Sequence, residues 1–142
     1  MMKNEVFLDT SYIIALSSLR DQHNQHAVKI ANQLKKDKTR LVTTQAVILE
    51  IGNALAKQRY RNFVIELISS LEADTNVEII PISEDLYKRA FQLYKDRLDK
   101  EWGLTDCISF IIMQDRGLVK VLTADEHFQQ AGFQALLLKR SW

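Results

Sequence analysis

The sequence predicts an α/β fold built on a parallel sheet, and three observations predict it. Five short apolar segments have the length and composition of strands, and helical periodicity fills the chain between them. Alternation of this kind produces parallel sheets covered by helices on both faces. The chain has 142 residues and neither an internal repeat nor a linker, which favours one domain over residues 1–142.

The first half of the chain supplies two strands and four helices. An apolar strand over residues 5–8 leads into a helix capped by Ser11, because Ser is a favoured N-cap residue. Apolar residues then recur at helical spacing, with breaks at polar stretches. The expected elements are a helix at 26–36, a strand at 41–43, and helices at 45–58 and 63–73.

The second half continues the alternation. A strand over residues 77–80 ends at the only proline, and Ser83 and Thr105 are the expected caps of the two helices that follow. Gly117 and Gly132 are expected to end helices in the left-handed conformation. The expected elements are helices at 84–98, 106–115 and 125–131, with strands at 119–122 and 133–138.

Composition excludes several classes of protein. Nineteen Lys and Arg against eighteen Asp and Glu give a net charge of +1, so a polyanion would have to meet a local basic patch. One Cys excludes a disulfide scaffold and a Cys-rich zinc module. No apolar stretch approaches the roughly 20 residues of a membrane span, and no signal peptide is visible. We expect a cytoplasmic protein with no membrane contact.

Acidic residues stand where such a fold places its ligands. In open parallel sheets, ligands bind beyond the carboxyl ends of the strands, at the point where the strand order reverses. Asp9 directly follows the first strand, and Asp125 closely follows the fourth. Asp106 begins the helix that leads to the fourth strand, and Glu50 lies on the helix after the second. Four acids from four segments are therefore expected at one rim.

Each acid also has a purely structural explanation. Asp9 and Asp125 are suitable N-caps, worth about 1 kcal/mol each, and Asp106 suits the positive end of a helix dipole. Glu50 is harder to explain in this way, because it borders an apolar stripe and has no Lys or Arg four residues away. If the four carboxylates converge, they repel each other and raise a pKa, or they bind a hard cation such as Mg²⁺ or Mn²⁺. Such an ion can activate water for phosphodiester hydrolysis.

Four segments resemble the motifs of PIN-domain ribonucleases of the VapC toxin type. An opening strand ends in DTS at residues 9–11, and a helix carries EIGN at residues 50–53. The segments WGLTDCISF at 102–110 and LTADEHF at 122–128 follow in order, and they are the most specific of the four. One departure is Gly103, where relatives commonly carry Ser.

This resemblance implies a five-stranded parallel sheet of order 3-2-1-4-5. It implies that four acids bind Mg²⁺ or Mn²⁺ and activate water to cut RNA. These residues are Asp9, Glu50, Asp106 and Asp125. The hydroxyl of Thr10 or Ser11 is expected to orient the first carboxylate, and Ser109 to act in the same way one turn after Asp106.

Other polar residues have two interpretations. Lys100 and Trp102 are expected to contact RNA, since their loop precedes Asp106, although a structural role is about equally consistent with the sequence. The basic cluster at residues 57–61 fits a solvated face better than a phosphate contact. His127 is expected to pack against or cap its short helix. Cys107, in an apolar helix, is expected to be an inert core thiol.

The resemblance implies the toxin of a toxin–antitoxin pair. The expected partners are a small antitoxin whose segment lies across the acidic groove and a second copy of the chain, bound through exposed apolar helices. One alternative is a PIN-domain RNA-processing nuclease without an antitoxin, and another is a non-catalytic module that binds RNA or protein. A receiver domain is disfavoured, because the third strand ends in Ile79-Ile80-Pro81 rather than in a phosphoacceptor Asp.

Overall fold

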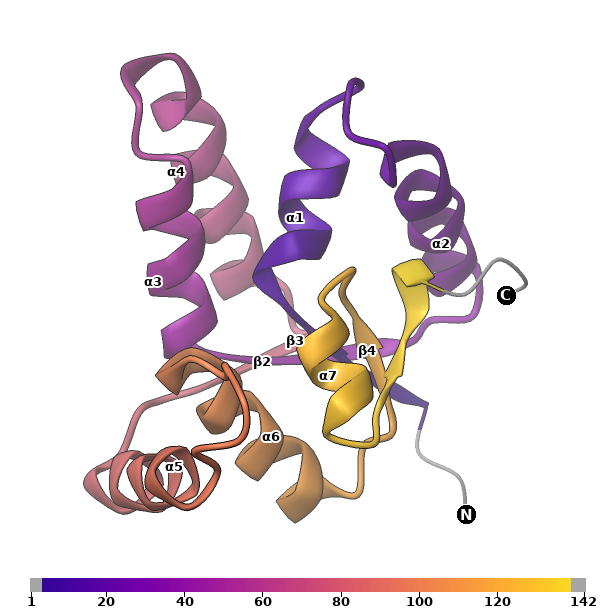
Figure 1. Ribbon diagram of the computed structural model, residues 1–142. Coiled ribbons are helices and arrows are strands. Elements are labelled where there is room, and N and C mark those ends of the chain that lie inside the picture. The colour runs from indigo at the N-terminus through magenta and orange to yellow at the C-terminus, as the bar shows by residue number, and fades with distance from the viewer. Residues whose placement is uncertain (1–3, 139–142) are drawn as a thin grey trace.

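The computed structural model describes residues 4–138, which form the predicted five-stranded parallel sheet (Figure 1). The strand order is β3-β2-β1-β4-β5, as the resemblance implies. The strands are β1 (Glu5–Leu8), β2 (Arg40–Thr44), β3 (Val77–Ile80), β4 (Lys120–Leu122) and β5 (Gln134–Ala135). Because β1 pairs with both β2 and β4, the order reverses between β1 and β4. The carboxyl ends of these two strands are therefore the expected place for a ligand.

Helices cover both faces of the sheet. The helices are α1 (Thr10–Ser17), α2 (Asn24–Lys36), α3 (Gln45–Ala54), α4 (Gln58–Ala73), α5 (Glu84–Asp96), α6 (Leu104–Arg116) and α7 (Glu126–Gln130). Figure 1 shows α1 to α4 on one side of the sheet and α5 and α6 on the other. Right-handed crossovers require this division, because the chain changes direction across the sheet after β3. Within residues 4–138, no helix has the length and hydropathy needed to cross a membrane.

Aromatic packing fixes the helices that carry the acidic residues. Phe110 of α6 is 1% exposed and meets Phe128 of α7 edge to face, with ring centroids 5.0 Å apart. Trp102, just before α6, meets Phe110 in the same way at 4.9 Å. Such pairs contribute ~0.5–1.5 kcal/mol each beyond the area they bury. The N-terminal ends of α6 and α7 are thereby held close together.

Several element boundaries differ from the sequence-based expectation. Helix α4 begins at Gln58, so the basic residues expected in a break lie in its first turn. Helix α6 is capped at Gly103 rather than Thr105, and the N-cap position of α1 is Asp9 rather than Ser11. The last strand has two residues and ends in a 3-10 turn at Leu136–Leu138. At α6 the difference has a local cause, because the Asp106 carboxylate accepts the Gly103 N–H and so fixes the start of the helix.

Candidate functional site

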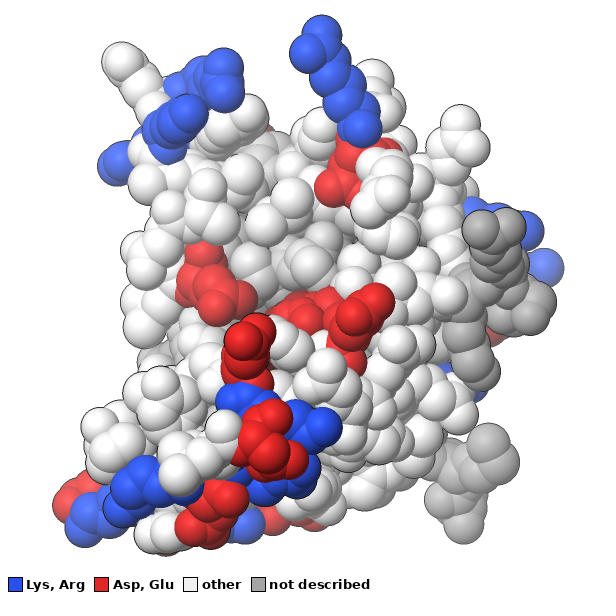
Figure 2. Space-filling model, in the orientation of Figure 1, with Lys and Arg blue, Asp and Glu red and all other residues white. Residues whose placement is uncertain are grey.

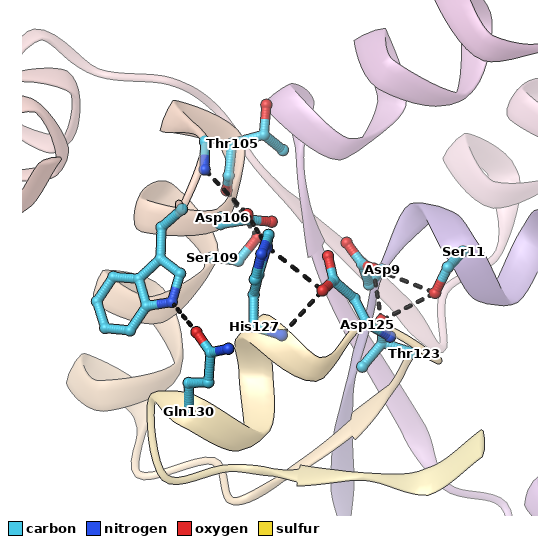
Figure 3. Close-up of polar contacts among 11 residues, drawn as sticks. Asp9, Ser11, Thr105, Asp106, Ser109, Thr123, Asp125, His127 and Gln130 are labelled. Atoms are coloured by element: carbon cyan, nitrogen blue, oxygen red, sulfur yellow. Dashed lines mark hydrogen bonds and ion pairs between the residues drawn. The ribbon is translucent and has the colours of Figure 1, made fainter. Parts of the chain in front are cut away.

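Asp9 lies at the carboxyl end of β1 and is almost completely buried. Its backbone N–H donates to the carbonyl oxygen of Leu122 at 3.2 Å, which continues the pairing of β1 with β4. Its side chain is 4% exposed, and the Thr123 hydroxyl donates to its Oδ2 at 2.7 Å (Figure 3). The sheet therefore places this carboxylate at the switch point and a β4-end hydroxyl holds it there.

Ser11 completes this hydroxyl network. Its Oγ accepts a hydrogen bond from the Ala124 N–H at 2.8 Å and lies 2.8 Å from Thr123 Oγ1. Since Thr123 gives its proton to Asp9, the Ser11 proton is directed to Thr123, which is closer than Asp9 Oδ2 at 3.4 Å. Ser11 thus supports Asp9 mainly through Thr123. Among the described residues, the buried Thr10 hydroxyl has no partner.

Asp106, Asp125 and His127 form the tightest group of potential metal ligands. One ligand atom from each lies within 4.8 Å of the others. His127 Nδ1 is 3.1 Å from Asp106 Oδ2 and 3.3 Å from Asp125 Oδ1, so the ring stands between the two carboxylates (Figure 3). Asp125 Oδ1 also caps α7 by accepting the His127 N–H at 2.8 Å. The capping role expected for Asp125 and its place beside Asp106 are therefore compatible.

Glu50 completes the set of predicted acids from a different side. It is half-buried on α3 and lines a small pocket with Asn53 and Thr105. No hydrogen bond or ion pair fixes its carboxylate within residues 4–138, and it lies outside the tight group of Asp106, Asp125 and His127. Its negative charge nevertheless raises the pKa of Asp9, so the two carboxylates are within electrostatic reach.

Burial and neighbouring carboxylates together raise the pKa values of two acids in the site. Burial raises the pKa of Asp9 to about 6, and the charges of Glu50 and Asp106 add to the effect. Burial also raises the pKa of Asp106, with Asp125 as a further cause. None of the four acids forms an ion pair with a Lys or Arg of the part of the chain described, residues 4–138. A divalent cation would satisfy this arrangement.

Trp102, expected to contact RNA, and Ser109, expected to orient Asp106, both form contacts within the protein core. Trp102 is 6% exposed, packs on Phe110 and donates from Nε1 to Gln130 Oε1 at 3.0 Å. The guanidinium of Arg97 lies 4.9 Å from the same ring. Burial of the ring disfavours a stacked base, and an RNA contact by Trp102 stays a prediction. Ser109 is fully buried and donates to the Thr105 carbonyl at 3.1 Å within its own helix, which leaves Asp106 without that hydroxyl.

Lys100 keeps a position compatible with its expected role. It is half-buried in the loop before α6 and forms no ion pair with a described residue. Gly103 contributes to the site through its backbone, because its N–H donates to Asp106 Oδ2 at 3.0 Å. A side chain at residue 103 is not needed for that bond.

Thr123 is a site residue that the sequence-based argument misses, and His127 is one that it underrates. The Thr123 hydroxyl forms hydrogen bonds with Asp9, Ser11 and the Asp125 backbone N–H. The sequence pattern that could have indicated this role is a hydroxyl residue between the end of a strand and an acid. His127 does belong to a capped short helix, but its ring contacts two acids. Its signal is a histidine two residues after a strand-end Asp.

Comparison with known proteins gives concordant matches. A family model described as the PIN domain matches residues 6–134. The 23S rRNA-specific endonuclease VapC20 of Mycobacterium tuberculosis is 25% identical over 128 residues, which cover 90% of this chain and 95% of that protein.

Solved structures share the fold. The crystal structure of M. tuberculosis VapC20, a sarcin-ricin loop cleaving toxin, matches with a TM-score of 0.78 and 22% identity over 90% of this chain and 95% of the other. DNA-bound VapBC from Salmonella typhimurium matches with a TM-score of 0.66 and 16% identity, covering 95% and 97% of the two chains. FitAcB from Neisseria gonorrhoeae gives a TM-score of 0.65 and 18% identity, covering 92% and 94%.

Proposed function

Since the chain belongs to the PIN-domain family, we propose that it is a metal-dependent endoribonuclease that hydrolyses RNA at its acidic rim. The observation that carries this proposal is that Asp9, Asp106 and Asp125 lie near one another at the sheet's switch point, and that no Lys or Arg among residues 4–138 pairs with them. Such charge is unfavourable in a protein that has no use for a cation. A role in binding a cation would account for both the position of the acids and the raised pKa values of Asp9 and Asp106.

The proposed metal ligands are the four predicted acids, and the ion is Mg²⁺ or Mn²⁺. Their donor atoms are hard oxygens, which both ions prefer, and the raised pKa values of Asp9 and Asp106 indicate charge that a cation would neutralise. When bound, such an ion lowers the pKa of a water molecule and stabilises charge on the scissile phosphate.

The residues around the acids have the task of holding them. Thr123 and Ser11 fix Asp9, the Gly103 N–H fixes Asp106, and the His127 N–H fixes Asp125. Outer contacts of this kind orient ligands and commonly affect metal affinity 10–100-fold when removed.

RNA is proposed to bind across the hollow that contains the acids. Figure 2 shows acidic side chains around this hollow, with Lys and Arg side chains at the outer ends of the α3–α4 and α1–α2 connections. The basic residues there are Lys57 in the α3–α4 connection, Arg59 and Arg61 in the first turn of α4, and Arg20 in the α1–α2 connection. No acidic residue within 4–138 forms an ion pair with any of them. They can therefore contact phosphates, and Lys100 is proposed to add a contact beside Asp106.

The proposed partners are a second copy of the chain and a small antitoxin. Helix α5 exposes Tyr87, Phe91 and Tyr94 as adjacent rings, and a pocket joins Tyr87 to the exposed Leu49 of α3. A matching face of a second copy would bury these side chains. A separate apolar cavity of about 590 Å³ lies between α1, α2 and α4. An antitoxin helix there, with a segment across the acids, would block RNA.

An RNA cleavage assay tests the proposal. A synthetic sarcin-ricin loop hairpin is the first substrate to use, since the relative VapC20 is specific for 23S rRNA. We expect cleavage in Mg²⁺ or Mn²⁺, none in EDTA, and a loss of at least 100-fold for Asp9→Asn. Glu66→Gln is the matched control, because Glu66 is exposed on α4. Equal cleavage by Asp9→Asn and the parent protein in Mg²⁺ would refute the assignment.

A further inference from the structure

We propose that His127 is itself a metal ligand, so that the site contains a nitrogen donor and binds Mn²⁺ in preference to Mg²⁺. This inference rests on the proposed metal-dependent function and adds a fifth residue to its four oxygen donors. It assigns a ligand role to the Nδ1 atom, which the four-carboxylate assignment leaves as a mere hydrogen-bond donor.

The two distances from His127 Nδ1 match neighbouring positions around one ion, and all three donor atoms lie within 4.8 Å of one another. Ligands ~2.1 Å from an octahedral ion and at right angles lie ~3.0 Å apart. His127 Nδ1 is 3.1 Å from Asp106 Oδ2 and 3.3 Å from Asp125 Oδ1. An ion could therefore bind all three atoms with only small side-chain adjustments.

The imidazole ring is held in place by contacts outside this group. The His127 backbone N–H is bonded to Asp125, and the next residue, Phe128, is fully buried against Phe110. One turn later on the same helix, Gln130 accepts the indole N–H of Trp102. Both ends of α7 are thus anchored beside the start of α6, and the ring is directed toward the acids before any ion binds (Figure 3).

The protonation pattern of the ring permits ligation. A histidine binds metal through a nitrogen without a proton, and the other nitrogen then carries the proton. Within residues 4–138, Nε2 has no hydrogen-bond partner, and the side chain is 30% exposed. Water can accept the Nε2 proton, which leaves the Nδ1 lone pair for the ion.

The chemistry of a mixed donor set predicts the metal preference. Imidazole nitrogen is a poor ligand for Mg²⁺, whereas first-row transition metals accept it readily, and carboxylates serve both classes. A site with His127 as ligand should therefore lose more affinity for Mn²⁺ than for Mg²⁺ when the ring is removed. A histidine that merely holds Asp106 and Asp125 in place should affect both ions alike.

Pulsed electron paramagnetic resonance of bound Mn²⁺ tests the assignment directly. We expect ¹⁴N coupling from an imidazole in the wild-type protein and in His23→Gln and His26→Gln, the matched controls among the three histidines. We expect His127→Gln to lose that coupling, with about tenfold weaker Mn²⁺ binding and Mg²⁺ binding unchanged within twofold. Histidine labelled with ¹⁵N in the wild-type protein shows that the coupling comes from a histidine, because the ¹⁴N coupling should then change to that of ¹⁵N, and the three variants identify which one.

Several outcomes would overturn the inference. They are no nitrogen coupling in the wild-type protein, a coupling that survives in His127→Gln, and an equal loss of Mn²⁺ and Mg²⁺ affinity. RNA cleavage is read separately. If RNA is cleaved but no nitrogen coupling is seen, the His127 assignment is wrong and the proposed function stands. If nitrogen coupling is seen but no RNA is cleaved, His127 is a ligand and the proposed function is wrong.

Discussion

Replacing Asp9 by Asn is expected to stabilise the metal-free protein while it removes the response to metal. Asp9 is 4% exposed, and burial is the main cause of its raised pKa, with the charges of Glu50 and Asp106 adding to it. Asn keeps an oxygen that can accept the Thr123 hydrogen bond, but it brings no charge into the site. The substitution therefore removes an unfavourable charge and retains most of the local structure.

The magnitude follows from the shift in pKa. A pKa of about 6, against an ordinary value of 3.8, is a shift of about two units, and each unit corresponds to ~1.36 kcal/mol. The buried charge thus costs ~3 kcal/mol of folding free energy at neutral pH. Because Asn forms a weaker hydrogen bond with Thr123 than a carboxylate does, we expect a net gain of ~1–3 kcal/mol.

The pH dependence has a defined sign. Above pH 6 the folded protein holds Asp9 charged, and the full cost is present. As the pH falls from 6 toward 3.8, the folded protein takes up a proton that the unfolded chain does not yet bind, and the cost disappears. The advantage of Asp9→Asn should therefore be largest at pH 7.5 and small near pH 4.

Urea unfolding in EDTA at pH 7.5 and pH 4.5 measures this difference, with Glu66→Gln as the control. Mn²⁺ at 100 times its Kd should then stabilise the wild-type protein by ~2.7 kcal/mol and leave Asp9→Asn nearly unchanged. The reasoning is refuted if Asp9→Asn is less stable than the wild-type protein in EDTA at pH 7.5. A gain that does not shrink at low pH would also refute it.

Three further outcomes are expected. Thr123→Val should lower the free energy of unfolding by ~1–3 kcal/mol and weaken Mn²⁺ binding at least tenfold, because Asp9 loses its shortest hydrogen bond. Urea unfolding measures the first effect, and metal titration measures the second. In the inactive Asp9→Asn protein, the double substitution Lys57→Gln and Arg59→Gln should weaken RNA binding and lower the slope of log Kd against log salt concentration by ~1–2. The control substitutions Lys29→Gln and Lys36→Gln on α2 should leave both unchanged. Phe91→Lys should convert a dimer to a monomer in sedimentation analysis, and Val28→Lys, at a similarly exposed position, should leave it intact.

The fold could be predicted from the sequence because each step depends on local patterns. Apolar runs predict the strands, and their alternation with helices predicts a parallel sheet. Asp9 and Asp125 could be placed near one another because both follow strands, and parallel strands present their carboxyl ends at the same edge. The strand order itself needs more than local pattern and came from the motif resemblance.

The parts that could not be predicted depend on contacts between distant segments. The indole of Trp102 finds its acceptor 28 residues away, so its burial could not be predicted from local pattern. Ser109 bonds to its own helix four residues back, a choice that the sequence leaves open. His127 faces Asp106 across 21 residues, so its proximity to the acids follows only from how α6 and α7 pack.

The bond between Thr123 and Asp9 spans 114 residues of chain and has a consequence for biosynthesis. During translation, Asp9 leaves the ribosome long before its β4 partner exists, so a growing chain has no assembled site. Non-local pairing of this kind forms late, after the intervening helices have folded. We therefore expect the site to assemble only when synthesis is nearly finished, and a fragment that ends before β4 to lack the Thr123 hydroxyl that holds Asp9.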